Sequence, residues 1–288
     1  MSGDPSPGRG RDGAIAGSAW PALELGTEVV DGLAALCRAA VAVLAPQRGP
    51  ETLRLSVRGL STGPVAVDAG GRLVEVTLDL RDHWLTVETS EGAVRPVALR
   101  DGVVPAEVLG QVVAALAEVG VDVGAGAVGE AGLGAVGARP VAYDPDVATR
   151  WWEALRRVDA ALESPELAMV EDRPGVLRPD SLTFVRPIGV SSGGGAQLGL
   201  AVSGDRAAGP GDGGGLPTEG RGSGLFARSE VDLPPDAVDA PLAPAAAVWL
   251  VEGFAWLPYD ALCASPDPTG AAEAFWQSAV AGFESAVA

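Results

Sequence analysis

Apolar and polar residues alternate with a period of two across residues 53–99. The clearest run is Val74, Val76, Leu78 and Leu80, in which a polar residue follows each of the first three. Short turn sequences divide the segment at residues 61–64, 68–71, 81–82 and 90–92. Because successive side chains of a strand point to opposite faces, this pattern predicts an antiparallel meander with one buried face.

Four other segments carry apolar residues at helical spacing. The clearest helix start is Tyr143-Asp144-Pro145-Asp146, where Asp144 is suited to cap a helix and Pro145 to occupy its first position. The helices predicted in this way cover residues 27–44, 105–119, 145–162 and 268–287.

Further strands are predicted at residues 182–185 and 198–202. Glu252-Gly253, between the apolar runs 247–251 and 254–257, is typical of a hairpin turn. The fold class that follows is α+β: an antiparallel β-sheet covered by amphipathic helices, with the late hairpin and the C-terminal helix packing back onto it.

Gly-rich and Pro-rich stretches set the expected domain organisation. Residues 1–18 hold too few apolar groups to offset the entropy of ordering, so we expect a disordered tail. Residues 19–288 are predicted to form a single α+β domain with flexible insertions at about 124–139 and 203–224. The Gly-rich runs 191–195 and 209–215 lack the strand–GxGxxG–helix context of a nucleotide site, and we interpret them as loops.

The charge balance excludes several classes of partner. The formal net charge is −18, and all 20 basic residues are arginine. A strongly acidic surface repels nucleic-acid phosphates, so no nucleic-acid partner is expected. The absence of lysine excludes P-loop and Schiff-base chemistry. No apolar run is long enough to cross a membrane and the first residues lack a signal-peptide core, so we expect a soluble, cytoplasmic protein.

Metal-binding and thiol residues are scarce. The chain contains one histidine, His83, and two cysteines, Cys37 and Cys263. These are too few for a histidine-rich zinc site or a disulfide framework, and we expect neither a metal nor a cofactor. Cys37 lies on the apolar face of the first predicted helix and is interpreted as a core residue.

Asp79, Asp82 and His83 are the candidate catalytic residues. A carboxylate beside an imidazole supports acid–base or metal-assisted chemistry. On a continuous strand Asp79 and His83 share a face, whereas Asp82 shares it only if a turn redirects it. The alternative is structural: Asp82 orders the turn and His83 satisfies a hydrogen bond beside Trp84.

Arg58, Trp152 and Tyr259 are candidate ligand-binding residues. Arg58, followed by the loop at residues 61–63, is suited to bind an anion, and the alternative is that it pairs with a nearby aspartate. Trp151 and Trp152 lie about 100° apart on a helix, so we expect only one of them to point fully into the core. The other is then available, with Tyr259, to line an apolar pocket, and the alternative is that these aromatic residues pack in the core.

The order of motifs resembles a bacterial family catalogued as domain of unknown function 5996. The resemblance is carried by five segments spread over nearly the whole chain: Trp20-Pro21-Ala22-Leu23, Arg58 to Pro64 (like RGLTTSPIP), Asp79 to His83 (like DFIDH), Tyr143 to Trp152 (like YDPxxAxRFW) and Leu257 to Asp260 (like LPYE). No established activity accompanies this family.

Two segments depart from the family pattern. Residues 49–54 stand where typical members have a stretch rich in His and Trp, and residues 182–187 stand where they have an HFFWGSFDLA-like strand. The resemblance therefore implies a divergent member that keeps the scaffold and binds a small molecule or a protein partner without catalysis. The alternative is a divergent enzyme that uses Asp79, Asp82 and His83 on a small substrate.

Overall fold

The computed structural model describes residues 19–44, 52–67, 71–121, 137–164, 167, 174–190, 194–202, 222–231, 233, 240–251 and 253–287. The predicted tail, residues 1–18, and most of the two predicted insertions lie outside these residues. Gly224, where the second predicted insertion ends, begins a strand.

The N-terminal half consists of two helices and a meander of strands. The expected helices and the β4–β5–β6 meander are confirmed here, as are the antiparallel pairings of β4 with β5 and of β5 with β6. The elements are α1 (Thr27–Ala42), β1 (Leu53–Leu55), β2 (Gly59–Ser61), β3 (Val65–Ala66), β4 (Leu73–Asp79), β5 (Trp84–Thr89), β6 (Val94–Ala98) and α2 (Pro105–Glu118).

The C-terminal half repeats this order of a helix, a run of antiparallel strands and a helix. The predicted hairpin is confirmed as β11 paired with β12. The elements are α4 (Pro145–Leu162), β7 (Val176–Arg178), β8 (Thr183–Gly189), β9 (Gly195–Ala201), β10 (Gly224–Ser229), β11 (Val248–Val251), β12 (Phe254–Pro258), α5 (Tyr259–Cys263) and α6 (Pro268–Val287).

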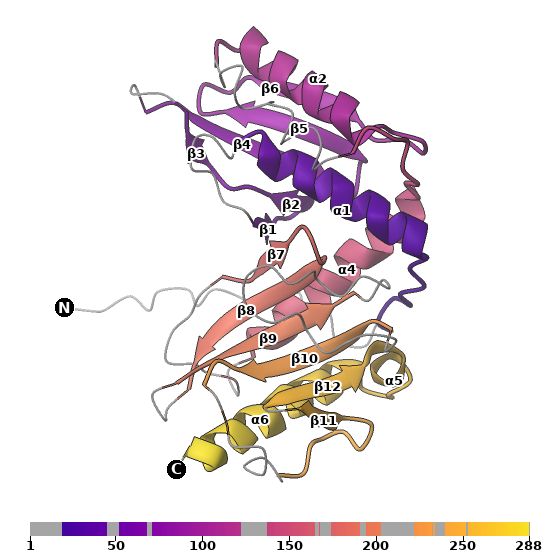
Figure 1. Cartoon of the computed structure of the whole chain (residues 1–288), viewed down its shortest axis with the longest axis vertical. Coiled ribbons are helices and arrows are strands. Elements are labelled where there is room, and N and C mark those ends of the chain that lie inside the picture. Colours follow the sequence, from indigo (N-terminus) through magenta and orange to yellow (C-terminus); the bar gives the residue numbers. More distant parts are fainter. Residues whose placement is uncertain are drawn as a thin grey trace, which may run out of the picture.

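The described strands of both halves belong to one antiparallel sheet. Its order is β11-β12-β10-β9-β8-β7-β1-β2-β4-β5-β6, and β3 pairs with β4 beside this path. The two halves meet where β1 pairs with β7, with Leu53 opposite Leu177. Figure 1 shows the halves stacked along the long axis of the molecule, so that each meander runs outward from the central β1–β7 pair.

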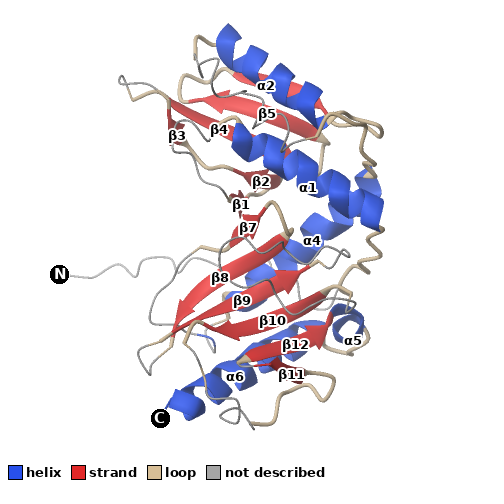
Figure 2. Cartoon of the chain, viewed as in Figure 1, coloured by secondary structure: helices blue, strands red, loops and turns tan. Residues whose placement is uncertain are grey.

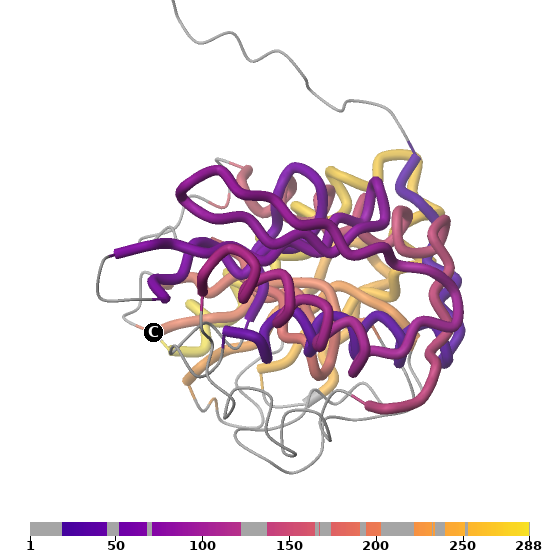
Figure 3. Tube along the Cα trace, turned by 90° about the horizontal axis from the view of Figure 1, so that it is seen from above, coloured from indigo at the N-terminus to yellow at the C-terminus, as the bar shows by residue number. Residues whose placement is uncertain are grey.

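The core lies on the face of the sheet that carries the helices. Leu60, Leu78 and Leu85 are in register across β2, β4 and β5, and all three are fully buried. In the C-terminal half Phe184, Leu200 and Leu225 form the matching row. Both rows belong to one apolar cluster with residues of α1, α2, α4 and α6. Figure 2 shows these helices against the sheet, and Figure 3 shows α1 and α2 together on one side of the N-terminal strands.

The opposite face of the sheet differs between the halves. Ser61, Thr77 and Thr86 are in register across β2, β4 and β5, and this face of the N-terminal half is therefore polar, with Ser61 buried and the two threonines half-buried. In the C-terminal half the corresponding face carries a second, separate apolar cluster, whose buried members are Val185, Ala201, Phe226, Phe254 and Trp256.

Several predicted boundaries are corrected. The alternation predicted a strand through Val57, but β1 ends at Leu55 and the Val57 side chain is 82% exposed in the following turn. Leu182 is not in a strand: it has a φ of 48° in the turn before β8. The strands β7 and β10 and the short helix α5 were not predicted. No helix of the described residues is long and apolar enough to cross a membrane.

Candidate functional site

Asp79 organises the turn between β4 and β5. Its Oδ1 accepts hydrogen bonds from the backbone N–H groups of Arg81 (3.0 Å) and Asp82 (2.9 Å). Its Oδ2 lies 3.8 Å from the Arg58 guanidinium. Asp79 is buried and Arg58 is mostly exposed. The local pairing expected as the alternative for Arg58 is therefore confirmed, and the turn is ordered by Asp79 rather than by Asp82.

Gly59 allows β2 to approach β4 closely beside this turn. A Cβ atom at Gly59 would collide with the backbone carbonyl oxygen of Leu78 and would lie 2.8 Å from the Leu80 nitrogen. The backbone N–H of Leu80 donates to the Arg58 carbonyl oxygen. Arg58 therefore supplies an ion pair to the turn. Gly59 permits a close contact between β2 and β4 that a residue with a Cβ atom would prevent.

His83 lies in this turn and contacts Tyr143, which precedes α4. The ring Nδ1 is 3.0 Å from the Tyr143 hydroxyl, and the two rings meet edge to face. His83 has a φ of 61°, a conformation that histidine adopts more readily than most residues. Because β4 ends at Asp79, the shared strand face considered for Asp79 and His83 does not form. His83 is half-buried, and the hydrogen bond expected for it is made to Tyr143.

Tyr143 is held firmly in place. Burial, assisted by the nearby Asp79 carboxylate, raises the pKa of its hydroxyl well above the usual value. Its backbone N–H donates to Asp101, and Thr149 Oγ1 on α4 donates to the carbonyl oxygen of Leu80 in the turn. These hydrogen bonds hold the start of α4 against the β4–β5 turn.

The neighbouring Asp82 is exposed, and its carboxylate makes no hydrogen bond or ion pair with the part of the chain that the structure describes.

Trp151 and Trp152 are both buried, which corrects the expectation that only one would be. Trp151 is fully buried and Trp152 is 4% exposed. The Arg156 guanidinium lies 5.2 Å from the centre of the Trp152 ring. Neither indole N–H has a hydrogen-bond partner among the described residues. Trp152 thus contributes to the core rather than to an open groove.

Tyr259 anchors the segment that precedes α1 to the C-terminal half. Its hydroxyl donates to the carbonyl oxygen of Pro21 (3.1 Å), and its ring packs against Trp20. The Trp20 indole N–H donates to Thr269 on α6. Burial raises the pKa of the Tyr259 hydroxyl. The two motifs at opposite ends of the chain, Trp20-Pro21 and Leu257 to Asp260, are therefore one structural contact.

The predicted site residues divide into separate groups. Arg58, Asp79 and His83 lie around the β4–β5 turn, with Asp82 on its exposed side. Trp152 lies in the core and Tyr259 lies against Trp20, and no described hydrogen bond or ion pair joins either of them to the turn.

A cleft lies instead where the two halves of the sheet join. It is an open cleft with a volume of about 260 Å³ beside β1, β8 and the C-terminal end of α4. The residues that line it are Arg54, Arg186, Asp159, Glu163, Leu55 and Pro174, and the side chain of Arg54, which pairs with Ser61, lies on the helix-free face of the sheet, opposite to that of Arg186. Gly175 completes the wall, and a Cβ atom there would collide with the Phe184 ring.

Arg186 is the most buried charged group of the cleft. It lies on the helix face of β8, with its side chain only 7% exposed, and its Nη1 is 3.5 Å from Asp159 and 3.8 Å from Glu163. The two acidic residues are four positions apart on and just after α4, so they face the strand together. A buried guanidinium requires such partners, because transfer of a charge out of water is costly.

The cleft residues were missed from the sequence alone. Asp159 and Glu163 at i and i+4 are a recognisable helical pair, and Arg186 interrupts an otherwise apolar strand. Their approach to Leu55, more than 100 positions away, depends on the β1–β7 pairing, which the sequence pattern did not predict. Among the described residues, no group of three or more His, Cys, Asp or Glu side chains is arranged to hold a metal ion.

The comparisons with known proteins identify one family. Residues 37–166 match DUF5996, a family of unknown function, over a segment that begins within α1 and ends just after α4. No curated protein and no solved structure gives a significant match to the chain. The matched segment contains the β4–β5 turn, Tyr143 and the acidic pair of the cleft, whereas Arg186 lies beyond it.

Proposed function

We propose that this chain, which is a member of the DUF5996 family, is a noncatalytic small-molecule-binding protein whose ligand occupies the cleft between the two halves. The cleft itself carries the proposal, because it combines a concave volume of about 260 Å³ with a buried charge beside the apolar side chains of Leu55 and Pro174. Binding pockets are typically concave and largely apolar, with a few placed polar groups. The β4–β5 turn lacks comparable support, because the Asp79 carboxylate is already engaged by backbone N–H groups and Arg58.

The proposal is tested by thermal unfolding of the full chain against a panel of metabolites and divalent metals. A ligand that binds only the folded state raises the unfolding temperature, by an amount equivalent to about 2.7 kcal/mol at a concentration of roughly 100 Kd. We expect at least one metabolite to do so without metal.

Pro174→Trp, at an exposed position of the wall, fills the cleft and is expected to abolish the shift. Val57→Trp is the matched control, because Val57 is 82% exposed in the turn after β1 and does not line the cleft. A panel without any shift, or a shift that survives Pro174→Trp, would contradict the proposal.

The alternative, an enzyme that uses Asp79, Asp82 and His83, has a separate readout. His83→Ala removes the imidazole without touching the cleft. A metal-dependent thermal shift that this variant abolishes would favour acid–base or metal-assisted chemistry at the turn over binding in the cleft.

A further inference from the structure

The two edges of the sheet differ in how they are protected. β6 forms one edge, where Pro96 lacks a backbone N–H and Arg95 Nη1 donates to the carbonyl oxygen of Val94 (3.0 Å). Prolines and charged residues commonly prevent an edge strand from pairing with another chain. β11 forms the other edge, at the opposite end of the molecule in Figure 1, and its residues Val248–Val251 include neither.

β11 ends a long apolar run. Residues 240–251, APLAPAAAVWLV, contain no charged side chain, and Trp249 Nε1 is their only polar side-chain atom. None of residues 240–250 is buried: Pro241, Ala245, Ala246 and Val248 are exposed, and the others are half-buried. We call residues 240–250 the apolar edge surface. Apolar residues gathered at an exposed site indicate a contact with another protein.

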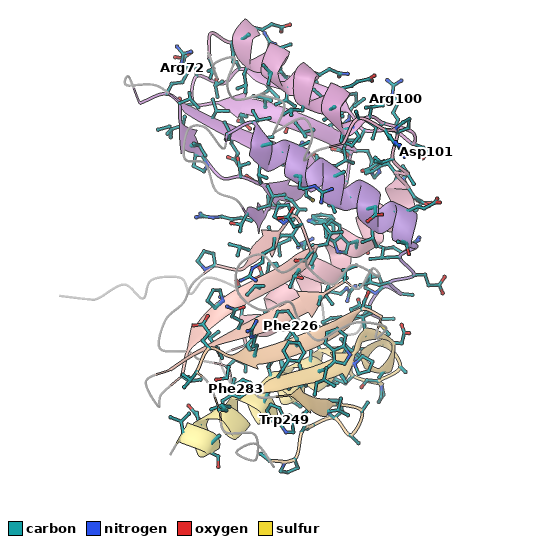
Figure 4. All side chains as sticks on the ribbon, in the orientation of Figure 1. Arg72, Arg100, Asp101, Phe226, Trp249 and Phe283 are labelled. Atoms are coloured by element: carbon teal, nitrogen blue, oxygen red, sulfur yellow. The ribbon has the colours of Figure 1, made fainter. Side chains whose placement is uncertain are left out.

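Hydrogen bonds and ring packing hold the apolar edge surface in place against α6. Trp249 Nε1 donates to the carbonyl oxygen of Ala240 (2.8 Å), and the Trp249 ring meets Phe283 edge to face. The backbone N–H of Ala243 donates to Ser278 Oγ (3.0 Å). Figure 4 shows Trp249 and Phe283 at the same end of the molecule. The surface is therefore ordered before it meets a partner, which lowers the entropic cost of binding.

We propose that the apolar edge surface is the contact between two copies of this chain in a two-fold dimer. Each copy carries a formal net charge of −18, so two copies approach most favourably where neither presents a charged side chain. A two-fold axis places the same patch on both sides of the contact, and an uncharged apolar patch is complementary to itself. A partner of opposite charge would gain no ion pair here, which favours the second copy.

The chain already joins two units in a comparable way. Its two halves share an order of elements and meet edge to edge, where β1 pairs with β7 in the antiparallel sense through strands of three residues each. A contact between β11 and its copy repeats this arrangement between chains. The register of β11 shifts between Trp249 and Val251, so the side chains of the surface contribute more to the contact than strand hydrogen bonds do.

The test is sedimentation velocity of the full chain over a wide range of concentrations, in which we expect a dimer. Val248→Lys places a charge from each copy at the contact and is expected to raise the dissociation constant of the dimer about tenfold or more. The Val248 side chain is 43% exposed on the helix-free face, opposite Trp256 of β12, so the fold tolerates the lysine.

Val94→Lys is the matched control. Val94 is 48% exposed on the same face of the sheet, but it lies in β6, at the other edge. This variant is expected to change the dissociation constant less than about twofold. Ala246→Glu, in the exposed turn before β11, tests the surface outside the strand and is expected to weaken the dimer as Val248→Lys does. Circular dichroism verifies that each variant is folded.

A chain that stays monomeric at every concentration would overturn the proposal, and its edge would then be free for a different partner. A dimer that survives both Val248→Lys and Ala246→Glu, or one that Val94→Lys dissociates equally, would also overturn it. The proposed function is tested separately, because none of residues 240–250 lines the cleft. A ligand-induced thermal shift is therefore expected to survive Val248→Lys.

Discussion

The two halves of the molecule share one order of elements but use the helix-free face of the sheet differently. In the N-terminal half the row of Ser61, Thr77 and Thr86 is polar. In the C-terminal half the row through Val185, Phe226 and Trp256 is apolar and buried. The first half is therefore buried on one face and the second on two, so the same topology supports two kinds of sheet. Figure 4 labels Phe226, within the strands of the C-terminal half.

The largest expected difference concerns Phe226. Its ring is fully buried and stacks nearly parallel to Phe254, with centroids 5.9 Å apart. Phe226→Ala is expected to lower the free energy of unfolding by about 3–5 kcal/mol, because it removes a packed aromatic ring and leaves a cavity. Thr77→Ala, at a half-buried position on the same face of the N-terminal half, is expected to cost less than about 1 kcal/mol. Urea unfolding of both variants measures the difference, and equal costs would show that the two faces are not distinct.

Close strand contacts provide a comparison in which the halves should behave alike. A Cβ atom at Gly199 would collide with the Phe184 carbonyl oxygen, as one at Gly59 would with that of Leu78. Gly199→Ala and Gly59→Ala are each expected to cost about 1–3 kcal/mol through overpacking.

Gly110 is the control for these two substitutions, because it lies inside α2 and a Cβ atom added there would meet nothing within 4 Å. Gly110→Ala is expected to stabilise the chain by about 0.5–1 kcal/mol, since alanine favours the helix. Urea unfolding checks all three variants. A neutral result at Gly59 with a large loss at Gly199 would mean that only the C-terminal strands are tightly packed.

The difference between the halves also explains which strands could be predicted from the sequence. Strict alternation around Val76 and Leu78 identified the N-terminal meander, because only one face is buried there. In the C-terminal half β8 and β10 bury residues on both faces, so Phe226 follows Leu225 without a polar residue between them. Such runs lack the period of two, so β8 and β9 were predicted only in part and β10 was not predicted. Helix starts depend on local signals, and the prediction that α4 begins after Asp144 was correct.

The candidate site was less predictable because it depends on contacts between distant segments. Asp79 and His83 were predicted to form a site because they lie close together in the sequence. The structure engages Asp79 within its own turn and joins His83 to Tyr143, 60 positions away. The cleft requires β1 to pair with β7, and no local pattern in Leu53 or Leu177 specifies that partner.

Alkaline pH is expected to reveal how deeply each half buries its thiol. Burial raises the pKa of Cys37 from 9.0 to about 12. Between these values the native state retains a proton that the unfolded chain has lost, so the free energy of unfolding falls as the pH rises through this window. The slope is at most about 1.4 kcal/mol per pH unit for one group.

Cys37→Ala should therefore lose less stability than the wild type when the pH rises from about 8 to about 10.5. Cys263, in the C-terminal half, is half-buried, and Cys263→Ala serves as the comparison. Thermal unfolding at the two pH values measures both losses. If Cys37→Ala lost as much stability as the wild type, the Cys37 thiol would not be the group that titrates.

The smallest expected effects concern the helices that open the two halves. Asp144 caps α4 by accepting hydrogen bonds from the N–H groups of Asp146 and Val147, whereas Gly26, at the N-cap position before α1, supplies no side-chain cap. Asp144→Ala is expected to cost about 1 kcal/mol, against little change for the exposed Glu153→Ala in the same helix.

Gly26→Ser should supply the missing cap to α1 and stabilise the chain by about a few tenths of a kcal/mol. Gly26 has an extended backbone conformation, with a φ of −63° and a ψ of 145°, and a Cβ atom there meets nothing within 4 Å. A serine side chain can therefore reach the free N–H groups of the first turn without strain. Urea unfolding in replicate resolves a change of this size, and a loss of stability would mean that the start of α1 depends on the freedom of glycine.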